Sequence, residues 1–419
     1  MVENLEPPPL SSKECCIYKI PTLFRNLNEE AYTPVVISIG PFHHGNKRLE
    51  TMEKLKLKYF KKFLQRTKFN VEILVNAIKT CEESVRSCYA ETIEFSSDDF
   101  VKLILVDGIF IIELFHEIWT LQGAYSVVRE NNILLNQISS EAMVSDMHDL
   151  LENQLPFFVL EILFSHAYAP YGDEYPNFTS LAIKVFERRN RQEFPRNHEE
   201  QQVEKRIRHF VHLTQAFLFP SSRKLLSPHE SNHLPSADRI YSANQLHEAG
   251  VKFKVSSSKC LLDLKFTNGT LEIPCIILDN STETSYRNVI AFEQCHYPYE
   301  SHFTDYIMLL SFLINTPKDA DLLIRKGIII NWLHNSNAVA SFLTNLATDV
   351  VYDGSKSVYR DLFKDLNAFY ENTKHTWKAT LKRDYFGTPW KIASTAAAVT
   401  LLLLTLVQTI CSIFQVVKM

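Results

Sequence analysis

The sequence has little of what marks the common enzyme families. It contains no GxSxG, P-loop, GxGxxG or HExxH pattern, and so lacks the motifs for a nucleophile elbow, a phosphate cradle or a zinc-binding helix. Its formal net charge is only −4, from 44 basic and 48 acidic residues, which argues against nucleic acid as the main partner. We expect no cofactor, and an enzyme built on an unfamiliar set of residues is the alternative.

The sequence also lacks the spacing of paired cysteines and the pattern expected of a secretory leader. Its eight cysteines form no CxxC pair and have no zinc-ligand spacing, and its first residues show no basic start followed by an apolar run. We therefore expect reduced, mostly buried thiols in a cytosolic domain. Cys81 and Cys88, about two helical turns apart, are a pairing that the sequence leaves open. The full set is Cys15, Cys16, Cys81, Cys88, Cys260, Cys275, Cys295 and Cys411.

Two Glu-x-x-His pairs are the nearest approach to a metal site. Glu113 with His116, and Glu293 with His296, have the spacing that places two ligands on one helix face in di-iron proteins. Such a short motif also arises by chance, and the sequence identifies no bridging carboxylates on facing helices. The adjacent Cys295 and His296 diverge on a helix or a strand, which disfavours a thiol nucleophile. We predict structural roles here, with no metal-binding and no catalytic residue.

The N-terminal half has an ordinary globular composition, in a chain that is 46% apolar and 22% charged with only ten glycines. Ile17 to Phe24 and Val35 to Ile39 are expected to be extended. Gly40 to Gly45, which contains two histidines, is expected to be a surface turn, with metal binding or pH sensing as the alternative. Apolar residues then recur at helical spacing from Met52 to Leu64. Phe100 to Phe115 is very apolar, but its three charges and 16 residues indicate core rather than a membrane span.

Two polar clusters adjoin apolar runs. Glu152-Asn153-Gln154 comes before Pro156, where an apolar helix is expected to begin, and Glu293-Gln294 ends another apolar run. Side-chain amides can cap and cross-link backbone groups inside a fold. The hypothesis is that both clusters hold helical layers in register. Polar stretches near 188–202 and 220–238 are predicted to be loops.

Beyond these loops, the spacing of the apolar residues changes from helical to alternating. Val251 to Val255 alternates between apolar and charged residues, Leu262 to Phe266 does so loosely, and Asn268-Gly269 is a strong hairpin signal. This predicts a small antiparallel β insert at about residues 250–280. Helical spacing resumes from His302. The expected fold class is therefore mainly α, a multi-helix globular domain with a small antiparallel β insert.

A long hydrophobic run appears only at the C-terminus. Ile392 to Val417 comprises 26 residues without a charge, and as a helix it would reach about 39 Å, more than the roughly 30 Å of hydrocarbon in a bilayer. We predict a transmembrane helix at 390–417, with a buried core helix as the alternative. Ala393 and Ala397 are small residues four apart, which favours a homodimer, with lipid-facing alanines as the alternative. The anchor residues singled out are Trp390, Ile392, Leu401, Leu404 and Val417.

The flanks of this run predict its orientation. Positive charge precedes the span and is nearly absent after it, and positive charge stays on the cytosolic side. The large domain should therefore face the cytosol, at either the plasma membrane or an endomembrane. An extracellular domain is the alternative, and the sequons at Asn177, Asn268 and Asn280 would suit it. The basic residues before the span are Lys374, Lys378, Lys382, Arg383 and Lys391.

Several segments stand in an order typical of one known family. They are IYKIPTLFRNLNEEAYTPVVISIGPFHHG (17–45), LVDGIFIIELF (105–115), DLLENQLPFFVLEILF (149–164), AGVKFKVSSSKCLLDLKF (249–266), LEIPCIILDNSTETSYRNVIAFEQCHYP (271–298) and the hydrophobic tail. In this order the chain resembles the plant domain-of-unknown-function family numbered 247. Ile109 departs from the pattern, since a cysteine often follows the Asp-Gly pair. The motif residues given structural roles are Gly40, Pro41, Asp107, Gly108, Glu152, Asn153, Gln154, Pro156, Glu293 and Gln294.

The resemblance implies a single, mostly helical domain with a C-terminal membrane segment and no established catalytic activity. Members in grasses are linked to self-incompatibility loci, which would imply recognition or signalling. We expect a flexible N-terminus at 1–16, the family domain at 17–386 and the transmembrane helix at 390–417. The predicted function is non-enzymatic: a membrane-anchored plant protein that recognises another protein. The alternative is a membrane-associated enzyme of unrecognised type.

Overall fold

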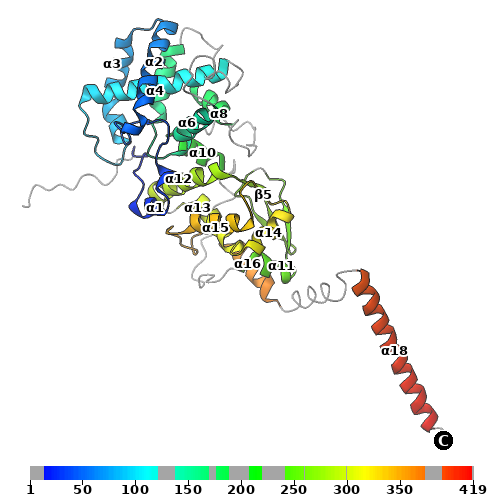
Figure 1. The fold of residues 1–419 in the computed structure, drawn as a ribbon. Helices are drawn as coiled ribbons and strands as arrows, with labels where there is room; N and C mark the ends of the chain where they lie inside the picture. The colour runs from blue at the N-terminus through cyan, green and yellow to red at the C-terminus, as the bar shows by residue number, and fades with distance from the viewer. Residues whose placement is uncertain are drawn as a thin grey trace, which may run out of the picture.

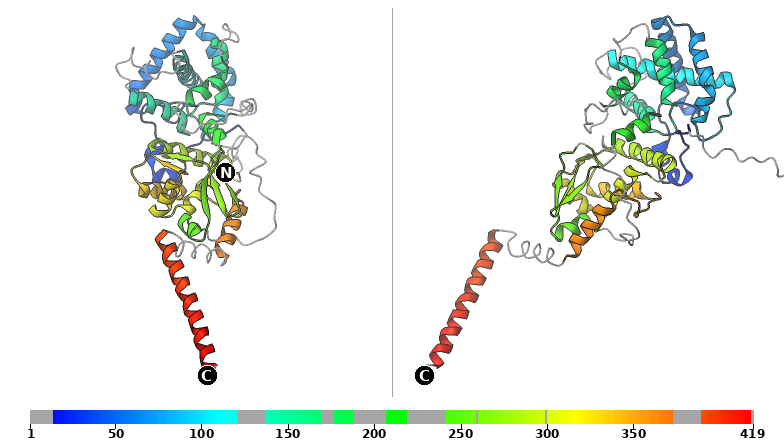
Figure 2. Two further views of the ribbon diagram at one scale, coloured as in Figure 1. Left: turned by 90° about the vertical axis from the view of Figure 1, so that its right-hand side faces the viewer. Right: turned by 180° about the vertical axis from the view of Figure 1, so that it is seen from behind.

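The computed structural model is an elongated molecule built mainly of helices, with one group in the N-terminal half, a second group with short strands beside it, and a single helix beyond (Figures 1 and 2). It confirms the mainly α fold with one C-terminal apolar helix. The predicted loops near 188–202 and 220–238 lie outside the described residues. The structure describes residues 14–120, 137–168, 176–187, 207–218, 241–258, 260–298, 300–372 and 389–417.

The N-terminal group surrounds one long helix, α4 (Ser97–Thr120). Because α4 is apolar on nearly every side, it can only lie inside the fold. Phe110, Ile112 and Phe115 are fully buried, so the interpretation of Phe100 to Phe115 as core is confirmed. The helices packed against α4 are α2 (Glu50–Thr67), α3 (Val71–Ser87), α7 (Phe157–Tyr168) and α8 (Phe178–Glu187).

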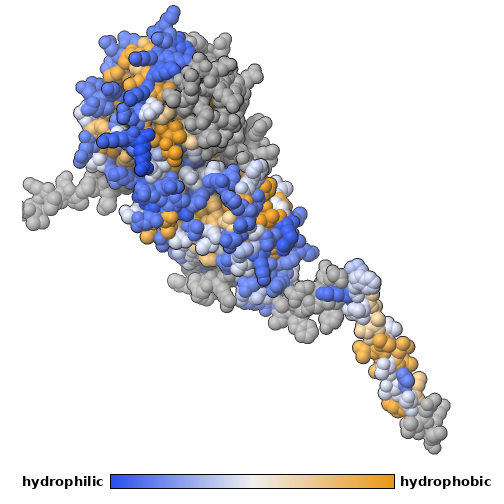
Figure 3. All heavy atoms as spheres, in the orientation of Figure 1, coloured by the Kyte–Doolittle hydropathy of each residue, from blue (hydrophilic) through white to orange (hydrophobic). Residues whose placement is uncertain are grey.

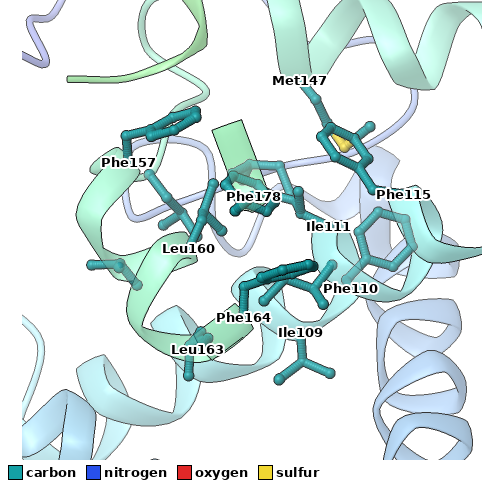
Figure 4. Packing of buried hydrophobic residues seen from close by; sticks show 14 of the residues in the cluster. Ile109, Phe110, Ile111, Phe115, Met147, Phe157, Leu160, Leu163, Phe164 and Phe178 are labelled. Atoms are coloured by element: carbon teal, nitrogen blue, oxygen red, sulfur yellow. The ribbon is translucent and has the colours of Figure 1, made fainter. Parts of the chain in front are cut away.

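Aromatic rings fill the space between α4, α7 and α8 (Figure 4). The ring of Phe178 stacks on Phe115 with centroids 5.9 Å apart, and lies 5.2 Å from Phe157 and 5.7 Å from Phe164. Aromatic pairs at such distances stabilise a core beyond the area that they bury. One side chain of α8 thus connects two other helices.

The second group forms its own core around α12 (Asn280–His296) and α13 (His302–Leu313), where Phe292, Phe303 and Tyr306 are fully buried. Between the two groups lie α6 (Gln137–Asp149) and α10 (Phe210–Leu218), which both pack against α12. The other helices of the second group are α11 (Ala243–Glu248), α14 (Pro317–Arg325), α15 (Ser336–Ala347) and α16 (Arg360–Glu371).

The predicted hairpin forms, but the sheets are mixed. Strands β2 and β3 are antiparallel, and Asn268 and Gly269 turn between them with φ of 50° and 73°. Strand β1 instead runs parallel to β3, and β4 runs parallel to β5, so the expectation of a purely antiparallel insert is corrected. A parallel pair needs a long crossover, and β5 follows α14, beyond the reach of a local pattern. The strands are β1 (Lys252–Val255), β2 (Lys265–Thr267), β3 (Thr270–Ile273), β4 (Ile276–Leu278) and β5 (Ile329–Asn331).

Residues 17–45, here called the N-terminal strap, run along both helical groups (Figure 1). Ile17 forms a β-bridge and the residues up to Pro21 are not helical, but the expectation of extended structure to Phe24 is wrong from Thr22 on, where α1 (Thr22–Leu27) begins; the 3-10 turn η1 (Glu29–Tyr32) follows it. The local reason is that the carbonyl of Pro21 accepts the first helical hydrogen bonds and Asn28 caps η1. Val35 to Ile39 is irregular, and a second 3-10 turn, η2 (Lys47–Leu49), leads into α2.

The C-terminal helix α18 (Pro389–Val417) extends away from the globular part (Figure 1). Within its stretch Pro389–Ile413, the most apolar window of 18 residues has a mean hydropathy of 2.1, and none of that window is buried. Figure 3 shows the apolar side chains along it. The prediction of one helix long and apolar enough to span a membrane is confirmed.

Candidate functional site

The candidate site is a buried polar junction between the two helical groups. Its centre is the turn Glu152-Asn153-Gln154. This turn follows the end of α6 and precedes α7, which begins directly after Pro156. These three polar side chains are 3%, 0% and 0% exposed. Burial of so many polar atoms is tolerated only where each finds a hydrogen-bond partner.

The side-chain amide of Gln154 forms hydrogen bonds with backbone groups at the ends of two helices. Its Nε2 donates to the carbonyls of Met147 and Leu150 at the C-terminus of α6, at 2.8 Å each. Its Oε1 accepts from the N–H of Phe210, the first residue of α10, at 2.9 Å. Helix ends leave backbone groups without partners inside the helix. One amide therefore fixes the position of α6 relative to α10.

Asn153 fastens the N-terminal strap to the same turn. Its Oδ1 accepts from the N–H of Ile39 at 2.6 Å, while its Nδ2 donates to the carbonyls of Ile37 and Asp146 at 3.0 and 2.9 Å. The carboxylate of Asp146 in turn accepts from three consecutive backbone N–H groups of the strap, those of Val35, Val36 and Ile37. Burial raises the pKa of Asp146 to about 6.

Glu152 binds the earlier part of the strap. Its Oε1 accepts from the N–H of Ile20 and from Nη2 of Arg25, both at 2.6 Å. Its Oε2 lies 3.1 Å from Nε2 of His43, which places this histidine of the predicted surface turn against the junction. Burial alone would raise the pKa of Glu152, but the contacts with His43 and Arg25 outweigh it and lower the pKa.

A buried ion pair lies beside the junction. Nζ of Lys56, on α2, is 2.6 Å from Oδ1 of Asp107, on α4, and the two side chains are 0% and 2% exposed. Oδ2 of Asp107 accepts from the N–H of Gly40 at 2.9 Å. Gly40 has a φ of +73°, and an added Cβ would stand 2.6 Å from the carbonyl oxygen of Gln154. Only glycine fits this close approach without strain.

Gly108 and Pro41, two further residues that were given structural roles, contribute to packing. An added Cβ at Gly108 would come within 2.5 Å of Cδ1 of Leu163, so Gly108 lets α4 and α7 approach closely. Pro41, next to Gly40, is buried in the strap. These contacts concern backbone position and helix spacing, and they leave no reactive group at a surface.

Glu293 binds backbone groups at the start of α13, as the central turn does at the ends of α6 and α10. The carboxylate of Glu293 accepts from the N–H groups of Phe303 and Thr304 in the first turn of α13, at 3.0 and 2.8 Å. It also accepts from Nε2 of Gln215, on α10, at 3.0 Å. A carboxylate at a helix N-terminus is favourable. Gln294 is partly exposed and accepts from the N–H of Val351 at 3.1 Å.

Sequence reasoning missed several members of the junction. Asn288, on α12, is fully buried; it accepts from the N–H of Leu151 at 2.9 Å and donates to the carbonyl of Ala31 at 2.8 Å. Asp146 and Lys56 were missed as well. The residues lie in stretches that read as ordinary polar helix faces, so no local signal singled them out.

The two Glu-x-x-His pairs are not brought together. Glu113 is paired with Arg66 at 2.8 Å, and Nδ1 of His296 is 2.8 Å from the hydroxyl of Tyr18. Within the described residues, no three His, Cys, Asp or Glu side chains lie close enough to hold a metal ion. Burial raises the pKa of Cys295 to about 11, which keeps this thiol protonated at neutral pH.

The predicted anchor residues lie along α18. Trp390, Ile392, Leu401 and Leu404 are 85%, 47%, 64% and 61% exposed. Ala393 and Ala397, the small residues considered for a homodimer, are exposed too. The side chain of Val417 lies outside the described part of the chain.

The sequence matches that of a plant family over most of its length. The profile of DUF247, described as "Plant protein of unknown function", matches residues 17–404, so the chain belongs to this family. It is 28% identical to a UPF0481 protein of Arabidopsis thaliana over 96% of this chain and 87% of the relative. A putative UPF0481 protein of the same plant is 24% identical over 98% of this chain and 93% of that relative. No solved structure matches at a significant level.

Gln154→Ala is expected to lower the free energy of unfolding of the domain by about 1–3 kcal/mol, because it leaves the buried N–H of Phe210 without its acceptor and removes the amide donor of the Met147 and Leu150 carbonyls. The melting temperature of the purified protein measures this. Gln294→Ala, which removes one hydrogen bond at a partly exposed site, is the matched control and should change the melting temperature little. An equal effect of both changes would contradict the role given to Gln154.

The junction should also make stability depend on pH. Burial raises the pKa of Glu293 to about 7. The folded protein therefore keeps the proton of Glu293 at pH values where the unfolded chain has released it. The stability that comes from this proton is fully present below the ordinary pKa of glutamate. Stability falls as the pH rises toward 7, by about 3 kcal/mol from this residue alone. Urea unfolding at pH 5 and pH 8 should show a smaller difference in Glu293→Gln than in the natural protein; equal differences would contradict this assignment.

Proposed function

We propose that α18 crosses a membrane and that the globular domain works at the cytosolic surface as a binding module for another protein. The observation that carries the proposal is the apolar surface of α18. The side chains of Leu402, Leu403 and Leu406 are 71%, 58% and 59% exposed. Such a surface is unfavourable in water and favourable in the hydrocarbon of a bilayer.

The charges beside α18 support the cytosolic side. Five basic residues stand between 374 and 391 against a single acidic one, and such an excess is retained in the cytosol. The sequons give an independent test, because Asn177, Asn268 and Asn280 are all exposed. On the other side of a secretory membrane they would be available for glycosylation.

The chemistry of the junction supports a binding module over an enzyme. The buried carboxyl groups of Asp146 and Glu293 accept hydrogen bonds from backbone N–H groups, so these groups are engaged in contacts within the fold. On the surface, Ile330 and Trp332 at the end of β5 are 42% and 61% exposed, and Figure 3 shows apolar side chains among hydrophilic ones in this region. Exposed tryptophan is a frequent anchor of protein interfaces.

The test is proximity labelling in plant cells with the labelling enzyme fused to the N-terminus of the full chain. A fusion to residues 389–419 alone is the control for proteins that merely share the membrane. We expect cytosolic proteins that the control does not label, and a loss of at least about fivefold of those proteins in Trp332→Ala but not in Val351→Ala, because desolvated aromatic anchors carry most interface energy. Identical protein sets for the full chain and the control, or glycans on the three sequons, would contradict the proposal.

A further inference from the structure

Two cysteines lie side by side where the chain enters the N-terminal strap and passes the end of α3. The N–H groups of Cys16 and Ile17 both donate to the carbonyl of Cys88 at 2.9 Å, and the N–H of Ala90 donates to the carbonyl of Ile17 at 2.9 Å. Ile17 and Tyr89 thereby form a parallel bridge. Cys16 and Cys88 stand one step before these bridging residues, and the backbone hydrogen bond from Cys16 to Cys88 brings them directly together.

The spacing of this bridge suits a disulfide. Paired strands lie about 4.8 Å apart, and the Cα atoms of disulfide-bonded cysteines are usually about 4.4–6.8 Å apart. The two thiols are within hydrogen-bond reach of each other. Both are free thiols, separated by 72 positions in the sequence, so tertiary structure alone brings them together.

The two thiols differ in reactivity. The thiol of Cys88 donates to the carbonyl of Ser84 at 3.2 Å, and its close contact with Cys16 lowers the pKa of Cys88 in spite of its burial. The same contact, together with burial, raises the pKa of Cys16. A thiolate is the reactive form of cysteine, so Cys88 is the nucleophile of the pair and Cys16 the resolving thiol.

Both side chains are shielded from large reagents. Cys16 is 2% exposed and Cys88 is 4% exposed. Only a small, uncharged oxidant such as hydrogen peroxide is expected to reach them in the folded protein. Cys81, the cysteine within α3, donates its thiol to the carbonyls of Ala77 and Ile78 in its own helix.

We propose that Cys16 and Cys88 are an oxidation site, at which hydrogen peroxide converts the two thiols into a disulfide that fastens the start of the N-terminal strap to the end of α3. The sulfur of Cys88 attacks one peroxide oxygen, the O–O bond breaks, and water leaves, which gives a sulfenic acid. The sulfur of Cys16 then attacks the sulfur of Cys88, the S–O bond breaks and a second water leaves. Two thiols and one peroxide thus yield one disulfide and two waters.

The bond would act on the junction through the strap. Just after Cys16, the hydroxyl of Tyr18 is 2.8 Å from His296 on α12, and the N–H of Ile20 donates to Glu152. A covalent link between Cys16 and Cys88 keeps the segment that makes these contacts next to the end of α3. The closed loop is long, so its loss of freedom in the unfolded state should raise the melting temperature by about 5 °C.

The experiment treats the full chain in detergent micelles with hydrogen peroxide, blocks the remaining thiols with N-ethylmaleimide under denaturing conditions, and maps linked peptides by mass spectrometry. We expect one linked pair, Cys16 with Cys88, lighter by two hydrogens and released by dithiothreitol, together with the higher melting temperature. Cys88→Ser should abolish the link, whereas Cys81→Ser should retain it. The linked peptides found in the natural protein show whether Cys16 and Cys88 form a disulfide, even if a variant folds poorly. Two unmodified thiols, a sulfinic acid at Cys88, or a link from Cys88 to Cys15 or Cys81 would overturn the proposal.

Discussion

Lys56→Met should lower the free energy of unfolding of the globular domain by about 3–5 kcal/mol, the largest effect that we expect from a single substitution. The change leaves the carboxylate of Asp107 buried at 2% exposure without its counter-charge. Burial already raises the pKa of Asp107, and the ammonium of Lys56 and the N–H of Gly40 oppose that rise. Urea unfolding followed by intrinsic fluorescence at pH 7 measures the loss. At pH 4 the loss should be smaller, because Asp107 then takes up a proton.

Lys54→Met is the matched control for this prediction. It lies on the same helix, but its partner Glu50 is 3.1 Å away at the surface, where both side chains are well exposed. Exposed pairs contribute at most about 1 kcal/mol. The double variant Lys56→Met/Asp107→Leu should recover much of the lost stability, because no lone charge stays buried. Equal effects of Lys54→Met and Lys56→Met would show that the buried pair has no special role.

Leu402→Arg combined with Leu406→Arg should release the protein from the membrane. Thirteen strongly apolar residues between 392 and 417 each favour insertion by about 0.3–0.6 kcal/mol, or about 4–8 kcal/mol together. Each arginine near the middle of the span costs about 2.5–3.5 kcal/mol and also removes the contribution of a leucine. Two of them cancel most or all of the driving force.

Alkaline carbonate extraction of plant cell membranes measures this release. The natural chain should stay in the membrane pellet, and the double arginine variant should move to the supernatant. Leu402→Val with Leu406→Val keeps both positions apolar and should stay in the pellet. If the arginine variant resisted extraction as well as the natural chain, α18 would not be what holds the protein in the membrane.

The parts of the fold that the sequence predicted are those governed by local pattern. The apolar run from Phe100 to Phe115 could only be buried, the dipeptide Asn268-Gly269 could only favour a tight turn, and the uncharged run of α18 could only be a long apolar helix. In each case the deciding forces act between residues a few positions apart. The polar clusters around Gln154 and Glu293 were also recognisable, because amides and carboxylates beside apolar runs need buried partners.

The identity of those partners was beyond the sequence. Asn153 bonds to Ile39, 114 positions earlier in the chain, and Asn288 bonds to Ala31, 257 positions away. The parallel pairing of β4 with β5 and the meeting of Cys16 with Cys88 are equally remote. Nothing in the spacing of either residue points to the other, since each contact depends on how whole helices pack.

By itself, the sequence determined that this chain is a mainly helical plant protein with a separate apolar helix at its C-terminal end. The helical content and the apolar helix follow from composition and hydrophobic period, whereas the plant family follows from the order of its sequence motifs. Only the tertiary structure decided that the N-terminal strap lies along both helical groups, and that Glu152 and Asn153 hold it there through its backbone. The physical reason is that backbone groups look the same in every sequence, so a side chain that binds them leaves no trace of its partner.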